Sequence, residues 1–363
     1  MNSTVVVVGG GYGGATVAKA LDDVAEVILV EKRDAFVHNV ASLRAVGDPA
    51  WADRMFLPYE GLLARGRVVR GHAELVEPGV VTLASGERVE ADFVVLATGS
   101  DYPFPAKVGD LDTAGAKARL TETRAALDAA DSVLLLGAGP VGLEFAGEIR
   151  AAWPDKKITI VDPFEEILST MPAEMGAEAK RQLAELGVEL LLGTSLLEPP
   201  VSEAGQVKPF TVALTSGAEV SADIWFRCYG AAPVTDYLAG GSLAGNRLPS
   251  GLVDVGDTLQ LVGQERVFAL GDITGIDEPK KAKAAEDHAQ LIAANIRTLI
   301  EGGTELATYQ VGGPMMALSI GPTGGVGYTP AHGLLGAEMT ARAKSADLRT
   351  TFYEELFGVT HLD

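Results

Sequence analysis

A glycine-rich loop of the type that binds phosphate occurs twice in this chain. Each copy follows a short apolar run, at residues 4–8 and 133–136, and each precedes a helix-like segment. The loops share the spacing G-x-G-x-x-G, with glycines at Gly9, Gly11 and Gly14 in the first copy and at Gly137, Gly139 and Gly142 in the second. Glycines at this spacing permit a tight turn, let the backbone approach a pyrophosphate and allow a helix to pack closely on a strand. The sequence therefore predicts two nucleotide-binding units.

Each loop is followed by a second apolar run that ends in an acid, Glu31 in the first copy and Asp162 in the second. Such an acid accepts hydrogen bonds from the adenosine ribose, while the helix N-terminus offers free N–H groups to the pyrophosphate. The alternative is that one copy is degenerate and only holds helix against strand. Because strand, loop, helix and acid are complete in both copies, we expect two bound dinucleotides.

The chemistry of dinucleotides suggests which two are bound. A nicotinamide cofactor passes a hydride, and a flavin can accept it and pass electrons onward. We therefore expect FAD at one loop and a nicotinamide cofactor at the other. Asp162 would repel the 2′-phosphate of NADPH, and residues 163–166 contain no arginine or lysine, so we expect NADH in preference to NADPH.

The duplication extends beyond the loops. Residues 83–99 resemble residues 214–230, and both segments end in a glycine after an apolar run, Gly99 and Gly230. Glycine at a strand end is typical where backbone passes close to a cofactor. The expected fold class is α/β, with two Rossmann-like dinucleotide-binding domains that carry small β excursions, and a C-terminal α+β segment.

The chain is expected to return to the first domain after the second. A short apolar run at residues 266–270 ends in Gly271 and Asp272, and an alanine-rich stretch at 282–300 reads as a helix. A carboxylate at this position can accept hydrogen bonds from the ribityl chain of a flavin, which places FAD at the first loop. The alternative is that Asp272 only caps a helix.

The composition of the chain limits the kinds of molecule it is expected to bind. The chain has 363 residues and a net charge of -20, which disfavours nucleic acid and anionic lipid as partners. No apolar run reaches the roughly 18 residues that cross a bilayer. The start Met1-Asn2-Ser3-Thr4 leaves no room for a signal peptide, and Asn2 is not the glycine that myristoylation needs. We expect a cytoplasmic protein with at most peripheral membrane contact and no metal site, in an oligomeric state that the sequence leaves open.

The chain contains one cysteine, Cys228. An internal disulfide is therefore impossible, which excludes disulfide reductase chemistry and two-cysteine sulfide oxidation. Cys228 itself reads as a small buried hydrophobic residue at the end of a strand.

Taken together, these motifs resemble the two-dinucleotide-binding-domain flavoprotein oxidoreductases. Within them the chain is similar to the apoptosis-inducing-factor-like branch that includes the ferroptosis suppressor proteins and bacterial relatives. The closer resemblance lies in the segments at residues 36–45, 97–105, 141–149, 288–296, 318–327 and 343–348.

This resemblance implies an FAD-dependent NAD(P)H:quinone oxidoreductase in which Glu144 lies beside the nicotinamide and the flavin, and Lys344 reaches the flavin. From the residues alone, two alternatives stay open. Glu144 can be a glutamate on the exposed face of a helix, and Lys344 can be a lysine in solvent. The further residues expected to contact the cofactors, besides the six loop glycines and the two ribose acids, are Lys32, Asn39, Arg44, Thr98, Gly99, Gly230, Gly271 and Asp272.

The expected boundaries give an FAD domain at residues 1–107 and 240–308, interrupted by an NADH domain at 108–239. Residues 309–363 form a segment that covers the flavin, β-like at 310–328 and helical from about 334. Two alternatives to a quinone-reducing enzyme stay open. One is a reductase of ferredoxin or another protein carrier, which the acidic composition disfavours if that carrier is itself acidic. The other is a redox sensor that binds NADH and turns over slowly.

Overall fold

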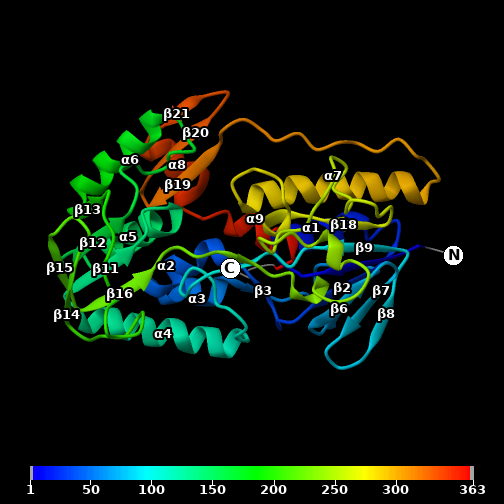
Figure 1. The fold of residues 1–363 in the computed structure, drawn as a ribbon, viewed down its shortest axis with the longest axis horizontal. Coiled ribbons are helices and arrows are strands. Elements are labelled where there is room, and N and C mark those ends of the chain that lie inside the picture. The colour runs from blue at the N-terminus through cyan, green and yellow to red at the C-terminus, as the bar shows by residue number, and fades with distance from the viewer. Residues whose placement is uncertain (1–2, 360–363) are drawn as a thin grey trace.

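Two parallel sheets form the framework of the molecule, which a computed structural model describes for residues 3–359 (Figure 1). The first sheet has the order β18-β9-β1-β2-β5. Its strands are β1 (Thr4–Val8), β2 (Glu26–Glu31), β5 (Arg67–Arg70), β9 (Phe93–Leu96) and β18 (Val267–Ala269). The second sheet has the order β13-β12-β11-β16. Its strands are β11 (Ser132–Leu136), β12 (Lys157–Asp162), β13 (Val188–Leu192) and β16 (Ile224–Arg227).

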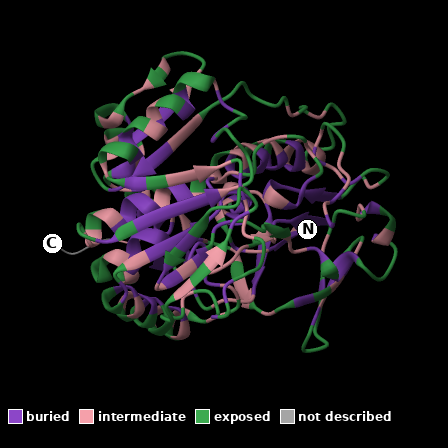
Figure 2. Ribbon diagram, turned by 60° about the vertical axis from the view of Figure 1, so that its left-hand side comes forward, coloured by how far each residue is buried: buried purple, intermediate pink, exposed green. Residues whose placement is uncertain are grey.

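The second sheet repeats four strands of the first in the same order, because β16-β11-β12-β13 corresponds to β9-β1-β2-β5. All neighbouring strands in both sheets pair in parallel. The inner strands β1, β9, β11 and β12 are largely buried on both faces, as Figure 2 shows, so they read as nearly continuous apolar runs. The internal duplication seen in the sequence is therefore a duplication of the fold, and the α/β class is confirmed.

Each sheet packs helices on one face and a small β excursion on the other. In the first unit the helices are α1 (Tyr12–Leu21) and α7 (Ala282–Ile300), and the excursion is β6 (Ala73–Glu77), β7 (Val80–Leu83) and β8 (Arg88–Glu90). In the second unit they are α5 (Pro140–Ala152) and α6 (Ala173–Glu185), with the hairpin β14 (Phe210–Ala213) and β15 (Glu219–Ala222) opposite. The helix predicted from about 282 to 300 is confirmed as α7.

The two units are joined along several elements. The chain crosses between them in β10 (Ser100–Asp101) and β17 (Ala232–Pro233), which pair antiparallel. Helix α2 (Ser42–Gly47) of the first unit packs against α5 and α4 (Thr113–Ala129), and α3 (Pro49–Arg54) packs against α4. The remaining short elements are β3 (Phe36–Val37), β4 (Phe56–Leu57) and the 3-10 turns at Asn39–Ala41, Asp236–Leu238, Ala244–Asn246 and Gly271–Ile273.

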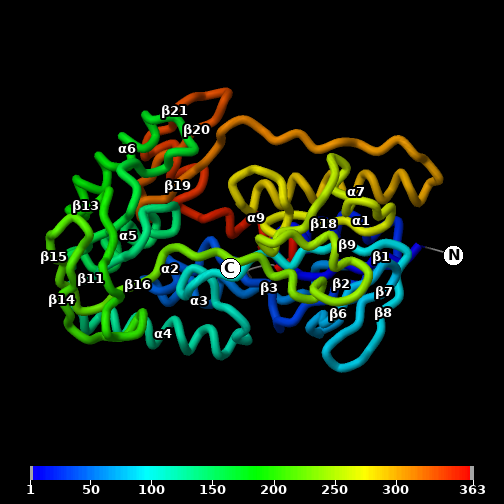
Figure 3. Tube along the Cα trace, viewed as in Figure 1, coloured from blue at the N-terminus to red at the C-terminus, as the bar shows by residue number. Residues whose placement is uncertain are grey.

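The C-terminal segment touches both units. Residues 303–315 run extended beside α7 (Figure 3), where Ala307 and the Asn295 side chain exchange two hydrogen bonds. An antiparallel sheet of β19 (Met316–Ile320), β20 (Gly324–Thr329) and β21 (Gly333–Leu335) then packs on α5 and α6. A helix α8 (Ala337–Thr340), a π-helix (Ala341–Ser345) and α9 (Thr350–Leu356) follow, and α9 returns to the first unit.

The predicted helical part of this segment is present, but it begins at Ala337 rather than at about 334. The chain is not helical from residue 334, since Gly333–Leu335 forms an edge strand beside β20. A turn closed by His332 N–H to the Thr329 carbonyl (3.3 Å), with Gly333 at φ 65°, reverses the chain there.

The expectations about Met1 and Asn2 lie outside the described residues, and the domain boundaries at 107, 239 and 308 stay predictions. Within residues 3–359 no helix is long and apolar enough to cross a membrane.

Aromatic side chains pack α9 against the start of α1, which follows the first glycine loop, and against β3. Tyr12 is the first residue of α1, and its ring centroid lies 5.0 Å from that of Tyr353. The ring centroids of Phe36 and Phe357 lie 4.6 Å apart. Tyr12 OH donates to His38 Nδ1 (3.0 Å), and His38 Nε2 donates to the carbonyl of Leu348 (3.0 Å). That carbonyl can only accept, so the proton of the neutral ring lies on Nε2 and Nδ1 accepts from Tyr12. Burial lowers the pKa of His38 to about 3.

We expect acid to loosen this junction through His38. A buried neutral histidine contributes stability that is complete above its unfolded pKa of about 6.5 and is lost as pH falls toward 3. The loss is at most about 1.4 kcal/mol per pH unit. Urea unfolding of the His38→Gln variant between pH 7 and 4.5 should show a flatter fall in stability than the wild type. The exposed His72→Gln variant is the control and should keep the wild-type slope. Equal slopes for all three proteins would rule out His38 as the acid-sensitive group.

Candidate dinucleotide and redox sites

The outer glycines of each loop are required by the protein's own packing. Gly9 and Gly137 adopt φ of 102° and 110°, which side chains rarely tolerate. A Cβ on Gly14 would overlap the carbonyl oxygen of Gly9, and a Cβ on Gly142 would overlap that of Gly137. The helix that follows each loop therefore sits closer to its strand than any larger residue would allow.

The middle glycines differ, because the protein itself does not need them. Gly11 and Gly139 are the N-caps of α1 and α5, both in extended conformation, and neither helix has a side-chain cap. A Cβ on either glycine would meet no atom within 4 Å. Free N–H groups at an uncapped helix N-terminus, with open space in front, fit the pyrophosphate of a dinucleotide. Both loops meet this requirement.

The two acids occupy equivalent positions. Glu31 accepts hydrogen bonds from Gly10 N–H (2.6 Å) and Arg33 N–H (2.9 Å). Asp162 accepts the same pair from Ala138 N–H (2.6 Å) and Phe164 N–H (2.9 Å). In each carboxylate one oxygen accepts from the loop and the other from the residue two positions further on, and the remaining lone pairs are left for the ribose hydroxyls.

The predicted residues at the strand ends lie along the same edge of each sheet. Gly99 and Gly230 have φ of 67° and 100°, and a Cβ on either would enter open space. Thr98 donates its hydroxyl to the Val234 carbonyl (2.5 Å), which ties β9 to the second crossover. Ligands of open α/β sheets bind at this carboxyl edge.

The Gly271-Asp272 turn follows β18 at the edge of the first sheet. Gly271 has φ of 70° and donates its N–H to His288 Nδ1 (3.1 Å). Asp272 accepts a hydrogen bond from the Ser100 hydroxyl (2.5 Å) on Oδ2. The N-cap of α7 is Lys281, so the alternative that Asp272 caps this helix is wrong. Sequence reasoning missed Lys107, whose ammonium lies 3.5 Å from the same Asp272 oxygen.

Three further predicted residues lie elsewhere in the first unit. Lys32 pairs with Asp110. Asn39 has a buried Oδ1 with no hydrogen-bond partner among residues 3–359, which leaves an acceptor for a ligand. Arg44 is 3% exposed and binds both carboxylate oxygens of Glu148 on α5 (2.7 and 3.0 Å). Cofactor contact by Arg44 stays a prediction, since in this structure its guanidinium links the two units.

Glu144 and Lys344 come together although they are 200 residues apart. Lys344 Nζ lies 2.6 Å from Glu144 Oε1 and donates to the Ala317 carbonyl (2.9 Å). Ser319 N–H also donates to Glu144 Oε1 (3.1 Å). The two side chains are only 15% and 19% exposed, so neither is the solvated surface residue of the alternative interpretations. The pair joins the second turn of α5 to the π-helix, a rare element that is frequent at functional sites.

Cys228 is buried at the end of β16, with 3% of its surface exposed. Burial raises the pKa of its thiol to about 12. The thiolate, which is the reactive form, is therefore absent near neutral pH.

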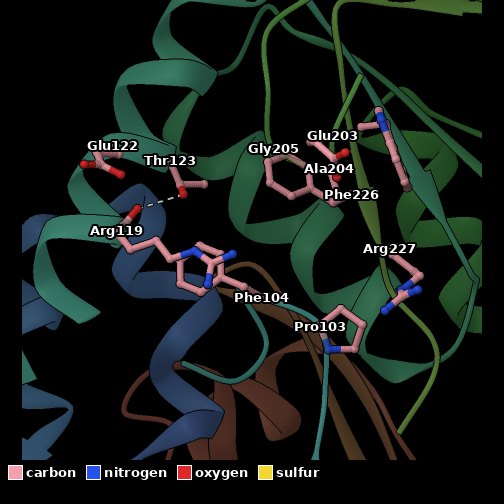
Figure 4. Close-up of a pocket in the computed structure, with 11 residues that line it drawn as sticks. Pro103, Phe104, Arg119, Glu122, Thr123, Glu203, Ala204, Gly205, Phe226 and Arg227 are labelled. Carbon is pink, nitrogen blue, oxygen red and sulfur yellow. Dashed lines mark hydrogen bonds between the residues drawn. The ribbon is translucent and has the colours of Figure 1, made fainter. Parts of the chain in front are cut away.

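A cavity of about 470 Å³ lies on the α4 side of the second sheet (Figure 4). Its lining comes from the crossover after β10, from α4, from residues 203–205 and from β16: Pro103, Phe104, Arg119, Glu122, Thr123, Glu203, Ala204, Gly205, Trp225, Phe226 and Arg227. None of the predicted site residues lines this cavity. The predicted dinucleotide sites lie elsewhere, at the two glycine loops, where a Cβ on Gly11 or Gly139 would meet no atom within 4 Å.

A bulky residue at Gly11 should prevent FAD binding without disturbing the fold. The Gly11→Val side chain would enter the open space in front of α1, where we expect the pyrophosphate. We expect soluble but colourless protein, whereas Gly139→Val should stay yellow and lose reduction by NADH. Gly14→Ala is the matched control and should unfold, because its Cβ has no room. Absorbance at the flavin band measures bound FAD, and circular dichroism measures whether the protein is folded. A yellow Gly11→Val protein would contradict the assignment of FAD to the first loop.

Comparison with known proteins agrees with this geometry. The family described as "Pyridine nucleotide-disulphide oxidoreductase" matches residues 3–289. The chain is 33% identical to "Ferroptosis suppressor protein 1" of Taeniopygia guttata over 358 residues, which cover 95% of this chain and 93% of that protein. It is 30% identical to "Apoptosis-inducing factor homolog B" of Dictyostelium discoideum over 365 residues, with 95% and 94% covered.

Solved structures share the fold at lower identity. The sulfide:quinone oxidoreductase from Aquifex aeolicus superposes with a TM-score of 0.76 at 17% identity, covering 99% of this chain and 92% of that one. The NDH2 structure from Plasmodium falciparum in complex with NADH gives 0.73 at 13% identity, covering 98% and 95%. The resemblance drawn from the motifs is confirmed, and so is the expectation of FAD and a nicotinamide cofactor. The chain belongs to the pyridine nucleotide-disulphide oxidoreductase family, and it is an FAD-dependent oxidoreductase that uses NAD(P)H.

Proposed function

We propose that this protein oxidises NADH and reduces a small quinone-like acceptor. The FAD supplies the relay, since a flavin accepts a hydride from NADH and can deliver two electrons onward. The first loop holds FAD through Gly11, Glu31 and Asp272, and the second holds NADH through Gly139 and Asp162.

The state of Cys228 carries this proposal. Disulfide enzymes of such folds pass electrons from the flavin to a cysteine pair, but this chain has one cysteine, buried and protonated. Electrons must therefore leave the flavin directly to an acceptor that reaches it. A quinone is small and takes two electrons. A structural neighbour of this chain is named as a sulfide:quinone oxidoreductase, which supports an acceptor of this class.

Glu144 and Lys344 are the groups best placed to act at the redox centre. Glu144 lies on the helix that begins at the NADH loop, so its carboxylate can orient the nicotinamide carboxamide for hydride transfer. Lys344 holds that carboxylate in one position and places a cation beside it. An ammonium there can stabilise the negative charge that forms as the acceptor is reduced.

Replacing Glu144 should slow hydride transfer more than it weakens FAD binding. In Glu144→Gln the shape is kept while the charge that fixes Lys344 is lost. We expect kcat to fall about 100-fold, the usual cost of losing one positioned polar group. The exposed Glu185→Gln variant is the control. Stopped-flow reduction of the yellow protein by NADH measures the step. Wild-type kcat in Glu144→Gln would remove Glu144 from the mechanism.

The coenzyme preference should follow from Asp162. Its carboxylate is oriented by Ala138 and Phe164 N–H groups, and a 2′-phosphate would meet it at contact distance. Lys156 donates to the Ala130 carbonyl at the opposite edge of the sheet, so it does not neutralise this charge. We expect kcat/KM to favour NADH over NADPH, and Asp162→Ser to reduce the ratio at least tenfold. Equal values in the wild type would show that Asp162 does not face the ribose.

An anaerobic acceptor screen tests the proposal directly. We expect rapid NADH oxidation when a short-chain quinone is added and slow oxidation without it. Stimulation by ferredoxin alone would instead favour a protein carrier as acceptor. A long-lived complex of reduced flavin and NAD⁺ that no acceptor discharges would favour a sensor. Either of these results would overturn the quinone assignment.

A further inference from the structure

A partly buried cation, Lys107, lies beside the Gly271-Asp272 turn. Lys107 Nζ donates to the Ser100 carbonyl (2.6 Å) and the Ser100 hydroxyl (2.9 Å), and it lies 3.5 Å from Asp272 Oδ2. The Ser100 hydroxyl in turn donates to that same carboxylate oxygen (2.5 Å). Three separate segments thus build one polar cluster at the carboxyl edge of the first sheet.

The lysine is not a solvated surface residue. Its side chain is 25% exposed, and its ammonium is directed toward Ser100 and Asp272. Burial lowers the pKa of Lys107, while the Asp272 charge beside it opposes this effect. A lysine held in this way loses hydration and side-chain conformational entropy. Both losses cost free energy that a lysine in solvent would not lose.

The cluster holds Asp272 by one oxygen and leaves the other available. Oδ2 receives Ser100 and faces Lys107, whereas Oδ1 accepts no hydrogen bond from residues 3–359. The turn lies at the end of β18, next to the end of β9 and on the same edge as the first glycine loop. A carboxylate fixed on one side and free on the other is suited to bind hydroxyl groups of a ligand.

We propose that Lys107 is a positioning residue of the flavin site, which fixes Asp272 for the ribityl hydroxyls and supplies a positive charge that favours the reduced flavin. Reduction adds electron density to the isoalloxazine ring, which the ribityl chain joins directly. A cation held beside the ribityl contact stabilises that added charge. The proposal rests on the assignment of FAD to the first loop, but not on the identity of the acceptor.

The test compares flavin affinity and reduction potential in Lys107→Met, Lys107→Arg and Ser100→Ala. Lys107→Met should weaken FAD binding at least tenfold. It should also lower the ratio of reduced to oxidised flavin about tenfold at a fixed potential, a shift of about 30 mV for two electrons. Lys107→Arg keeps the charge and should restore the potential. Ser100→Ala should weaken FAD binding, because Asp272 loses its shortest hydrogen bond.

Two controls keep the result specific. The exposed Lys208→Met variant in the second unit should keep wild-type affinity and potential. NADH binding by the apoprotein should be unchanged in every variant, which separates a local effect from a folding defect. Wild-type affinity and potential in Lys107→Met would overturn the proposal. If Lys107→Met does not fold, wild-type FAD affinity in Ser100→Ala would overturn it as well. Failure of the FAD assignment itself would appear separately, as a yellow Gly11→Val protein.

Discussion

The packing of one glycine against another underlies both halves of this molecule. Gly14 lies against the Gly9 carbonyl and Gly142 against the Gly137 carbonyl, closer than any side chain would allow. This contact brings the first turn of each helix directly over the end of its strand. The uncapped N–H groups are thereby aimed into the space in front of Gly11 or Gly139. The two acids, the strand-end glycines and the Glu144–Lys344 pair are all positioned relative to these two helices.

The two units work together because buried polar contacts join them and the C-terminal segment. Arg44 binds Glu148 on α5 and also reaches the Ala346 carbonyl, so one side chain touches all three parts. Burial raises the pKa of Glu148, and the guanidinium opposes that effect. A buried ion pair adds little net stability, but removing one partner leaves an uncompensated charge and is strongly destabilising. Such a pair penalises misaligned arrangements, which suits a reaction that depends on the mutual position of two cofactors.

The redox chemistry also follows from what surrounds each polar group. Cys228 lies in an apolar cluster, and burial raises the pKa of its thiol to about 12. Glu144 and Lys344 are largely shielded from solvent and pair with each other at the junction of α5 and the C-terminal sheet. Lys107 and Asp272 repeat this pattern at the first sheet. In a protein with a net charge of -20, the two lysines proposed to act near the flavin are thus each held by a carboxylate.

The sequence by itself determined the duplicated α/β architecture, both loops and the limits of α7. These features depend on local patterns: apolar runs, glycine spacing and helical periodicity within a few residues. The proposed role of Glu144 and Lys344 rests on family resemblance, and their contact came only from the structure. Tertiary structure alone decided the Arg44–Glu148 and Lys107–Asp272 pairs, which join residues 104 and 165 positions apart. It also decided that Gly333–Leu335 is a strand, because an edge strand is stabilised by its neighbour β20 and not by its own sequence. Local patterns report backbone preference, whereas the pairing of distant charges is decided by how the units pack.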